Sequence, residues 1–296
     1  MTTRGGPRPS VHGMFAGHRG AIHEFAAALE RADASARVLG ARARAARDGA
    51  GPAAAFSALA AAGPEGLVPK MGTGGALAAR HLEQAALAAA AAGPALPDDV
   101  TDALAHAVAT ARAQSGGSNA LDPRGASSAV RRDVAAVRGL ADDALPRDHD
   151  WHVMRLGTHL PRAAWMSALL LACATAARDE PDAAGSVWHA ASLVAGGDGL
   201  GDLLLDVRLP MSVARSVDEV VASLFALSKG GSVEPGALAM ARATSARLGD
   251  PAMAREIERD PVGAIGATLD AIGAIAATAV TRPTAVPPAT GRPVAA

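Results

Sequence analysis

Apolar residues recur at spacings of three, four and seven along much of the chain, which is the pattern of helices that bury one face. Over residues 18–48, the stripe comprises Ile22, Phe25, Leu29, Ala32, Ala36 and Leu39. Over residues 151–177, a second stripe comprises Val153, Leu156, Leu160, Ala163, Ser167, Leu170 and Ala174. The spacing therefore predicts two long amphipathic helices.

Glycine, proline and aspartate interrupt this pattern at intervals, and the interruptions predict where the other helices begin and end. Shorter helices are predicted over about 53–62, 76–92, 99–113, 127–145, 186–195, 210–228, 235–248 and 251–280. The last of these should break near Asp260-Pro261. Pro161 lies inside the second long helix, where it removes a backbone hydrogen bond and clashes with the preceding turn, so we predict a kink or break there.

The composition favours the same fold class. Half of the 296 residues are hydrophobic, only 2% are aromatic and Tyr is absent. Alanine dominates many segments and has the highest helix propensity, whereas strands favour β-branched and aromatic residues. We therefore predict an all-α fold, with one bundle-like helical domain over residues 12–280. Residues 1–11 are rich in Gly, Pro and Arg, and residues 281–296 are rich in Pro, so both ends are predicted to be disordered.

Several classes of function are disfavoured. The net charge of −1 lacks the basic surplus of nucleic-acid-binding proteins. The first residues carry no signal-peptide core, and the apolar stretches 163–177 and 262–280 are better explained as core helices than as membrane spans. We expect a soluble, cytoplasmic protein. The single cysteine, Cys173, lies in an apolar run and is interpreted as a buried, unreactive thiol. Because the sequence has no zinc-ligand spacing, P-loop or dinucleotide fingerprint, we expect no metal and no cofactor.

Two of the predicted helices carry a similar short motif. Leu29-x-Arg31-Ala32 in the first recurs as Leu160-x-Arg162-Ala163 in the second, 131 residues later, which suggests an internal repeat. A third segment reads Leu203-Leu-Leu-Asp206, followed by Pro210-x-Ser212-Val213. With these three motifs in this order, the chain resembles the bacterial alpha-E family, a domain of unknown function, over about residues 14–228.

The resemblance implies an all-α domain. Members of that family tend to be encoded beside ATP-grasp proteins and transglutaminase-like proteins, which implies a role in ATP-dependent peptide ligation or protein modification. Glu30 is the counterpart of the glutamate for which the family is named. The chain also departs from the family's pattern, because Pro161 stands where the second motif would have Glu.

The candidate site lies around Glu30. Glu30, Asp33 and Arg37 fall within one sector of their helix, and Asp33 and Arg37 are spaced to form an ion pair. Arg155 and Arg162 could complement these carboxylates if the two motif helices pack together. Such a cluster could face a ligand or partner, or it could be a salt-bridge network that holds two helices in register.

The remaining candidates for binding a ligand or partner are Arg31, Asp206 and Ser212. A group of histidines with neighbouring acids, comprising His149, His152 and His159, is interpreted as solvated side chains at a turn.

Three hypotheses about function follow. In the first, the chain is an accessory helical protein that binds an ATP-grasp-type ligase, a transglutaminase-like protein or a peptide. In the second, it is an enzyme that uses Glu30 as acid or base, with Arg31, Arg37 and Arg162 binding substrate carboxylates. In the third, it is a structural bundle that has lost the family's activity.

Overall fold

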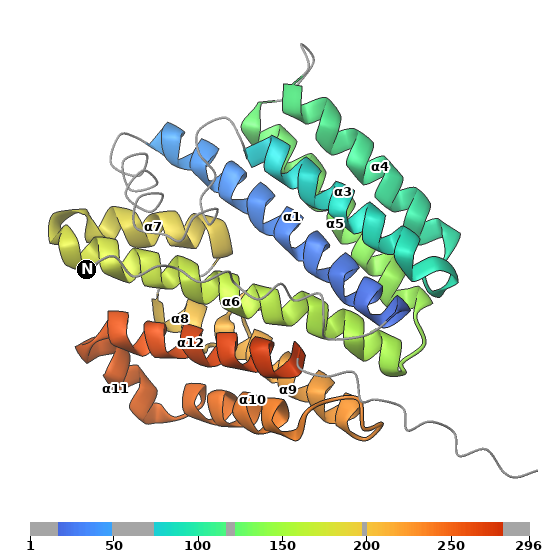
Figure 1. The fold of residues 1–296 in the computed structure, drawn as a ribbon. Helices are drawn as coiled ribbons and strands as arrows, with labels where there is room; N and C mark the ends of the chain where they lie inside the picture. The colour runs from blue at the N-terminus through green and yellow to red at the C-terminus, as the bar shows by residue number, and fades with distance from the viewer. Residues whose placement is uncertain (1–16, 49–73, 117–121, 197–199, 281–296) are drawn as a thin grey trace, which may run out of the picture.

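A computed structural model describes residues 17–48, 74–116, 122–196 and 200–280, and these residues form helices without any strand (Figure 1). The helices are α1 (His18–Asp48), α3 (Gly74–Ala92), α4 (Asp98–Gly116), α5 (Pro123–Ala144), α6 (His149–Asp179), α7 (Ala184–Ala195), α8 (Leu200–Leu205), α9 (Val213–Ser228), α10 (Pro235–Leu248), α11 (Pro251–Arg259) and α12 (Pro261–Val280). The predicted all-α fold is confirmed. The helix predicted over 53–62 and the two predicted disordered ends lie outside the described residues.

Most predicted boundaries are close to the observed ones. The predicted break near Asp260 separates α11 from α12. The start of α5 was placed too late, because Asp122 caps this helix by accepting hydrogen bonds from the backbone N–H groups of Arg124 and Gly125, at 2.8 and 3.2 Å. The short helix α8 was not predicted, since six residues are too few to show a periodicity.

Of the kink or break predicted at Pro161, the break is wrong, because α6 continues through this residue to Asp179, and the kink stays a prediction. Pro161 is only half-buried, whereas Leu160 and Ala163 on either side of it are 4% and 0% exposed. The helix is therefore held in place by packing on both sides of the proline. This packing outweighs the local cost of the missing N–H group.

Helices α1 and α6 lie side by side at the centre of the molecule (Figure 1). They run in the same direction, because Arg19 near the start of α1 pairs with Asp150 near the start of α6, and Glu30 pairs with Arg162 further along. Helices α3 and α5 cover α1, with α4 beyond them, and α9 and α12 cover α6 on the opposite side. The central pair therefore has most of its surface buried.

The two central helices approach each other very closely at Gly157 of α6. A Cβ atom at this position would lie closer than 3.0 Å to the backbone carbonyl oxygen of His23 and 3.1 Å from the Cβ of Ala26, both on α1. Only glycine fits such an approach of one helix to the backbone of another. The crossing at Gly157 therefore fixes the distance between α1 and α6, and with it the position of Glu30 relative to Arg162.

Two helices, α6 and the 261–279 part of α12, are long and apolar enough to cross a membrane, judged by length and composition alone. The most apolar window of α6 is 61% buried, as is usual for the core helix of a soluble protein, and the value for α12 is 28%. Asp270 is exposed on α12. Neither helix has clear transmembrane character, and a soluble protein remains the prediction.

Candidate functional site

Glu30 lies on α1 with 2% of its surface exposed, and its carboxylate is held by arginines from two other helices. Arg162 of α6 donates from Nε to Oε1 at 2.9 Å and from Nη2 to Oε2 at 2.6 Å. Arg138 of α5 donates from Nη2 to Oε2, also at 2.6 Å. We call these three residues the Glu30 cluster. Two-pronged pairing of this kind is the strongest arrangement of arginine with a carboxylate, and here it joins three helices.

Asp33 lies one turn further along α1 and extends this network. Its carboxylate accepts a hydrogen bond from Nε of Arg37 at 2.8 Å, and Arg131 and Arg138 lie within 3.5 and 3.6 Å. Burial alone would raise the pKa of Asp33, but Arg37, Arg138 and Arg131 together hold that pKa below its ordinary value. Asp33 is therefore an anion at neutral pH, and Arg138 bridges it to Glu30.

Of the arginines named from the sequence, Arg37 pairs with Asp33, and Arg155 and Arg31 also lie outside the Glu30 cluster. Arg155 does not complement Glu30, because it pairs with Glu219 of α9 and lies over the ring of Trp151, with 5.1 Å from its guanidinium carbon to the ring centroid. Arg31 is partly exposed and pairs with Glu24 on its own helix. The motif arginine of α6 thus reaches the glutamate of α1, whereas the motif arginine of α1 turns towards solvent.

Asp206 and Ser212 have structural roles in the turn between α8 and α9. The carboxylate of Asp206 accepts hydrogen bonds from the backbone N–H and the guanidinium group of Arg208. The buried hydroxyl of Ser212 caps α9 by accepting from the backbone N–H of Arg215 at 3.1 Å. The turn contacts the Glu30 cluster through the carbonyl oxygen of Pro210, which accepts from Nη1 of Arg162 at 3.5 Å.

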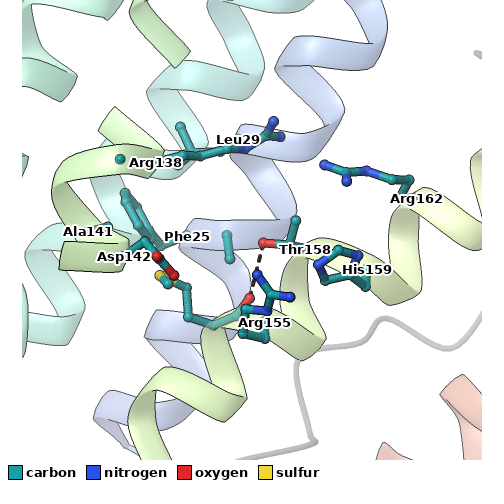
Figure 2. A pocket seen from close by; sticks show the side chains of 12 residues that line it. Phe25, Leu29, Arg138, Ala141, Asp142, Arg155, Thr158, His159 and Arg162 are labelled. Carbon is teal, nitrogen blue, oxygen red and sulfur yellow. Dashed lines mark hydrogen bonds between the residues drawn. The ribbon is translucent and has the colours of Figure 1, made fainter. Parts of the chain in front are cut away.

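An open pocket of about 310 Å³ lies between α1, α5 and α6, beside the Glu30 cluster. Figure 2 shows Arg138 and Arg162 reaching the pocket from α5 and α6, with Arg155 and His159 on earlier turns of α6. The pocket is lined by Phe25, Ala26, Leu29, Arg138, Gly139, Ala141, Asp142, Met154, Arg155, Thr158, His159 and Arg162. Sequence reasoning named Arg155 and Arg162 but missed Arg138 and His159.

His159 is a buried residue of the pocket wall, so its interpretation as a solvated turn histidine was wrong. Only 6% of the residue is exposed. Burial, and then the positive charges of Arg162, Arg155 and Arg138, lower the pKa of His159 to about 2. The imidazole is therefore neutral throughout the physiological pH range.

The depressed pKa of His159 makes folding sensitive to acid. The unfolded chain binds a proton at this histidine below about pH 6.5, whereas the folded protein does not until about pH 2, so stability falls as the pH decreases below 6.5. Between pH 8 and pH 5, this histidine alone should cost about 2 kcal/mol of unfolding free energy. Over the same change of pH, urea unfolding should show that His159→Leu loses about 2 kcal/mol less unfolding free energy than the wild type. Equal losses in the two proteins would contradict this assignment.

The family model that matches this chain has a Glu-Arg motif, and Glu30 of the cluster is followed by Arg31. Alpha-E, described as a predicted alpha-helical domain with a conserved ER motif, matches residues 25–197. The chain belongs to the Alpha-E family. Glu30-Arg31 is the one Glu-Arg pair in the matched sequence, and the match runs from α1 through α7. No curated protein and no solved structure matches the chain.

In this Alpha-E chain, the two residues of the motif do different things. Glu30 points into the protein and joins three helices, whereas Arg31 remains at the surface. Both carboxylate oxygens of Glu30 already accept hydrogen bonds from arginine. Cys173 is also unsuited to chemistry, because burial raises the pKa of its thiol to about 12. Neither Glu30 nor Cys173 is therefore well placed for acid–base or nucleophilic catalysis.

Proposed function

We propose that this Alpha-E protein is a cytoplasmic, non-catalytic accessory protein of an ATP-dependent peptide-ligation or protein-modification system. In that role it binds a partner enzyme, either an ATP-grasp-type ligase or a transglutaminase-like protein, and holds a peptide. The resemblance to the alpha-E family motivates the choice of partner. The observation that supports an accessory role is the burial of Glu30 together with the pairing of both its carboxylate oxygens with Arg162 and Arg138.

A general acid or base must exchange its proton with a substrate, and it needs at least one oxygen free to reach that proton. Glu30 is 2% exposed and would have to give up an arginine before it could do so. Separating the buried Arg162 from the carboxylate with which it pairs would be costly. The Glu30 cluster is therefore better suited to holding α1, α5 and α6 in place than to catalysing a reaction.

Co-expression of the tagged full chain with an ATP-grasp-type protein, and separately with a transglutaminase-like protein, tests this proposal. We expect one of them to co-purify at a fixed stoichiometry and to modify its peptide substrate faster in the presence of the Alpha-E protein. The absence of co-purification and of any effect on the modification rate, with both proteins folded, would refute the accessory role.

The same assay separates the accessory role from the enzyme hypothesis. Glu30→Gln should leave the modification rate nearly unchanged when it is measured at a temperature where circular dichroism shows the variant to be folded. Glu24→Gln, which also removes a carboxylate of α1 that pairs with an arginine, serves as the control. A rate that falls about a hundredfold in the folded Glu30→Gln protein, but not in the control, would favour Glu30 as the catalytic group.

A further inference from the structure

The pocket between α1, α5 and α6 has a cationic wall that can be reached from solvent. The side chains of Arg138 and Arg155 are 25% and 26% exposed, whereas that of Arg162 is 11% exposed. Among the described residues, Nε of Arg138, Nε of Arg155 and Nδ1 of His159 have no hydrogen-bond partner. Buried polar nitrogens without a hydrogen-bond partner are uncommon in folded proteins, and these three belong to side chains that line the same pocket.

Positive charge exceeds negative charge around this wall. Glu30 and Asp33 are shared by four arginines, and Glu219 is shared by two more. Asp142, the carboxylate on the pocket wall, has its own partner in Arg147. On the pocket lining itself, three arginines stand against one carboxylate, Asp142. This excess of positive groups on the lining favours an anion.

Part of the pocket lining is apolar. Phe25, Ala26 and Leu29 line it from α1, Ala141 lines it from α5 and Met154 lines it from α6. The volume of about 310 Å³ lies at the small end of the range for ligand sites and is too small for an extended peptide. A free inorganic anion would leave the apolar part unfilled. A carboxylate attached to a hydrocarbon group would use both parts.

We infer that this pocket binds a carboxylate joined to an apolar group, such as the last residue of a peptide. The carboxylate would face Arg138 and Arg155, and the apolar group would lie at Met154, the most exposed of the apolar lining residues. This inference rests on the proposed function, because it names the part of the peptide that the accessory protein holds. The carboxylate can come from a peptide C-terminus or from an acidic side chain.

Calorimetric titration of the full chain with short peptides tests the inference. The probes are N-acetyl-Gly-Ala-Leu with a free C-terminus, the same peptide as its C-terminal amide, and N-acetyl-Ala-Glu-Ala-amide. We expect the free acid to bind at least about tenfold more tightly than its amide, because a hydrogen-bonded charge is lost in the amide. Tighter binding of the glutamate peptide than of the Leu amide also supports the inference and identifies a side-chain source. Equal binding of all three peptides overturns it.

Arg155→Met and Arg215→Met form a matched pair of variants. Both remove an arginine from Glu219, but only Arg155 lines the pocket. We expect Arg155→Met to weaken binding of the free acid about tenfold or more and Arg215→Met to change it less than twofold, with similar thermal unfolding of both variants. Equal affinities of the two variants overturn the inference. The inference is also overturned if inorganic phosphate displaces the bound peptide as effectively as acetyl-leucine does.

The two proposals fail in different ways. If a ligase co-purifies but no probe binds at millimolar concentration, the carboxylate pocket is wrong and the accessory role stands. If the free acid binds as expected but neither partner enzyme associates, the accessory role is wrong. The carboxylate preference of the pocket is then established by itself.

Discussion

Replacing Glu30 by Gln is expected to lower the free energy of unfolding by about 3 kcal/mol, because it leaves Arg162 and Arg138 without their shared carboxylate. Removing one partner of a buried ion pair costs more than the pair itself contributes, since the remaining charge stays away from water without compensation. The Arg162 side chain is only 11% exposed, so its charge would remain largely out of water. Urea unfolding at pH 7.5 measures this loss.

Glu24→Gln is the matched control for this experiment. Glu24 is also on α1 and also pairs with an arginine, but its partner Arg31 is 36% exposed. Because exposed pairs contribute at most about 1 kcal/mol, this variant should lose less than that. Adding Arg162→Met to Glu30→Gln should recover part of the lost stability, since no unpaired charge then remains at that position. Equal losses in the two single variants would contradict the role assigned to the Glu30 cluster.

Local signals in the sequence were sufficient to predict most helices. The bounds of α1 and α10 were predicted to the residue, because glycine and proline mark both of them clearly. The start of α5 carried a usable signal, Asp122 followed by Pro123, which is a capping residue before proline at the first helical position. Pro161 misled the prediction for a different reason. Its effect on α6 is decided by packing, which a local propensity does not contain.

The candidate site was predicted only in part, since periodicity indicates which face of a helix is buried but not which helices lie against it. The repeated Leu-x-Arg-Ala motif led to Glu30 and Arg162, which lie together because α1 and α6 run side by side. Arg138 comes from α5 and Glu219 from α9, and no motif links either of them to Glu30. His159 was misread because it follows two histidines at a turn, although it lies ten residues into α6 and faces the pocket.

Gly157→Ala is expected to lower the free energy of unfolding by about 3 kcal/mol, although alanine is the better helix former. The added Cβ would lie closer than 3.0 Å to the backbone carbonyl of His23, and a backbone atom cannot rotate away as a flexible side chain would. Helices α1 and α6 must therefore separate until this distance reaches an ordinary contact. The separation also lengthens the hydrogen bonds between Glu30 and Arg162, which are made by the same two helices.

Gly139→Ala provides the control, because Gly139 is an exposed residue inside α5 and an added Cβ would meet nothing within 4 Å. The same chemical change should there raise the free energy of unfolding by roughly 0.5–1 kcal/mol, through helix propensity alone. The two substitutions should therefore change the free energy of unfolding in opposite directions. The difference between these changes measures how strongly the close contact of α1 with α6 contributes to stability. If Gly157→Ala were as stable as Gly139→Ala, the crossing would be able to widen without cost. The position of Glu30 against Arg162 would then have to be maintained by the arginines themselves.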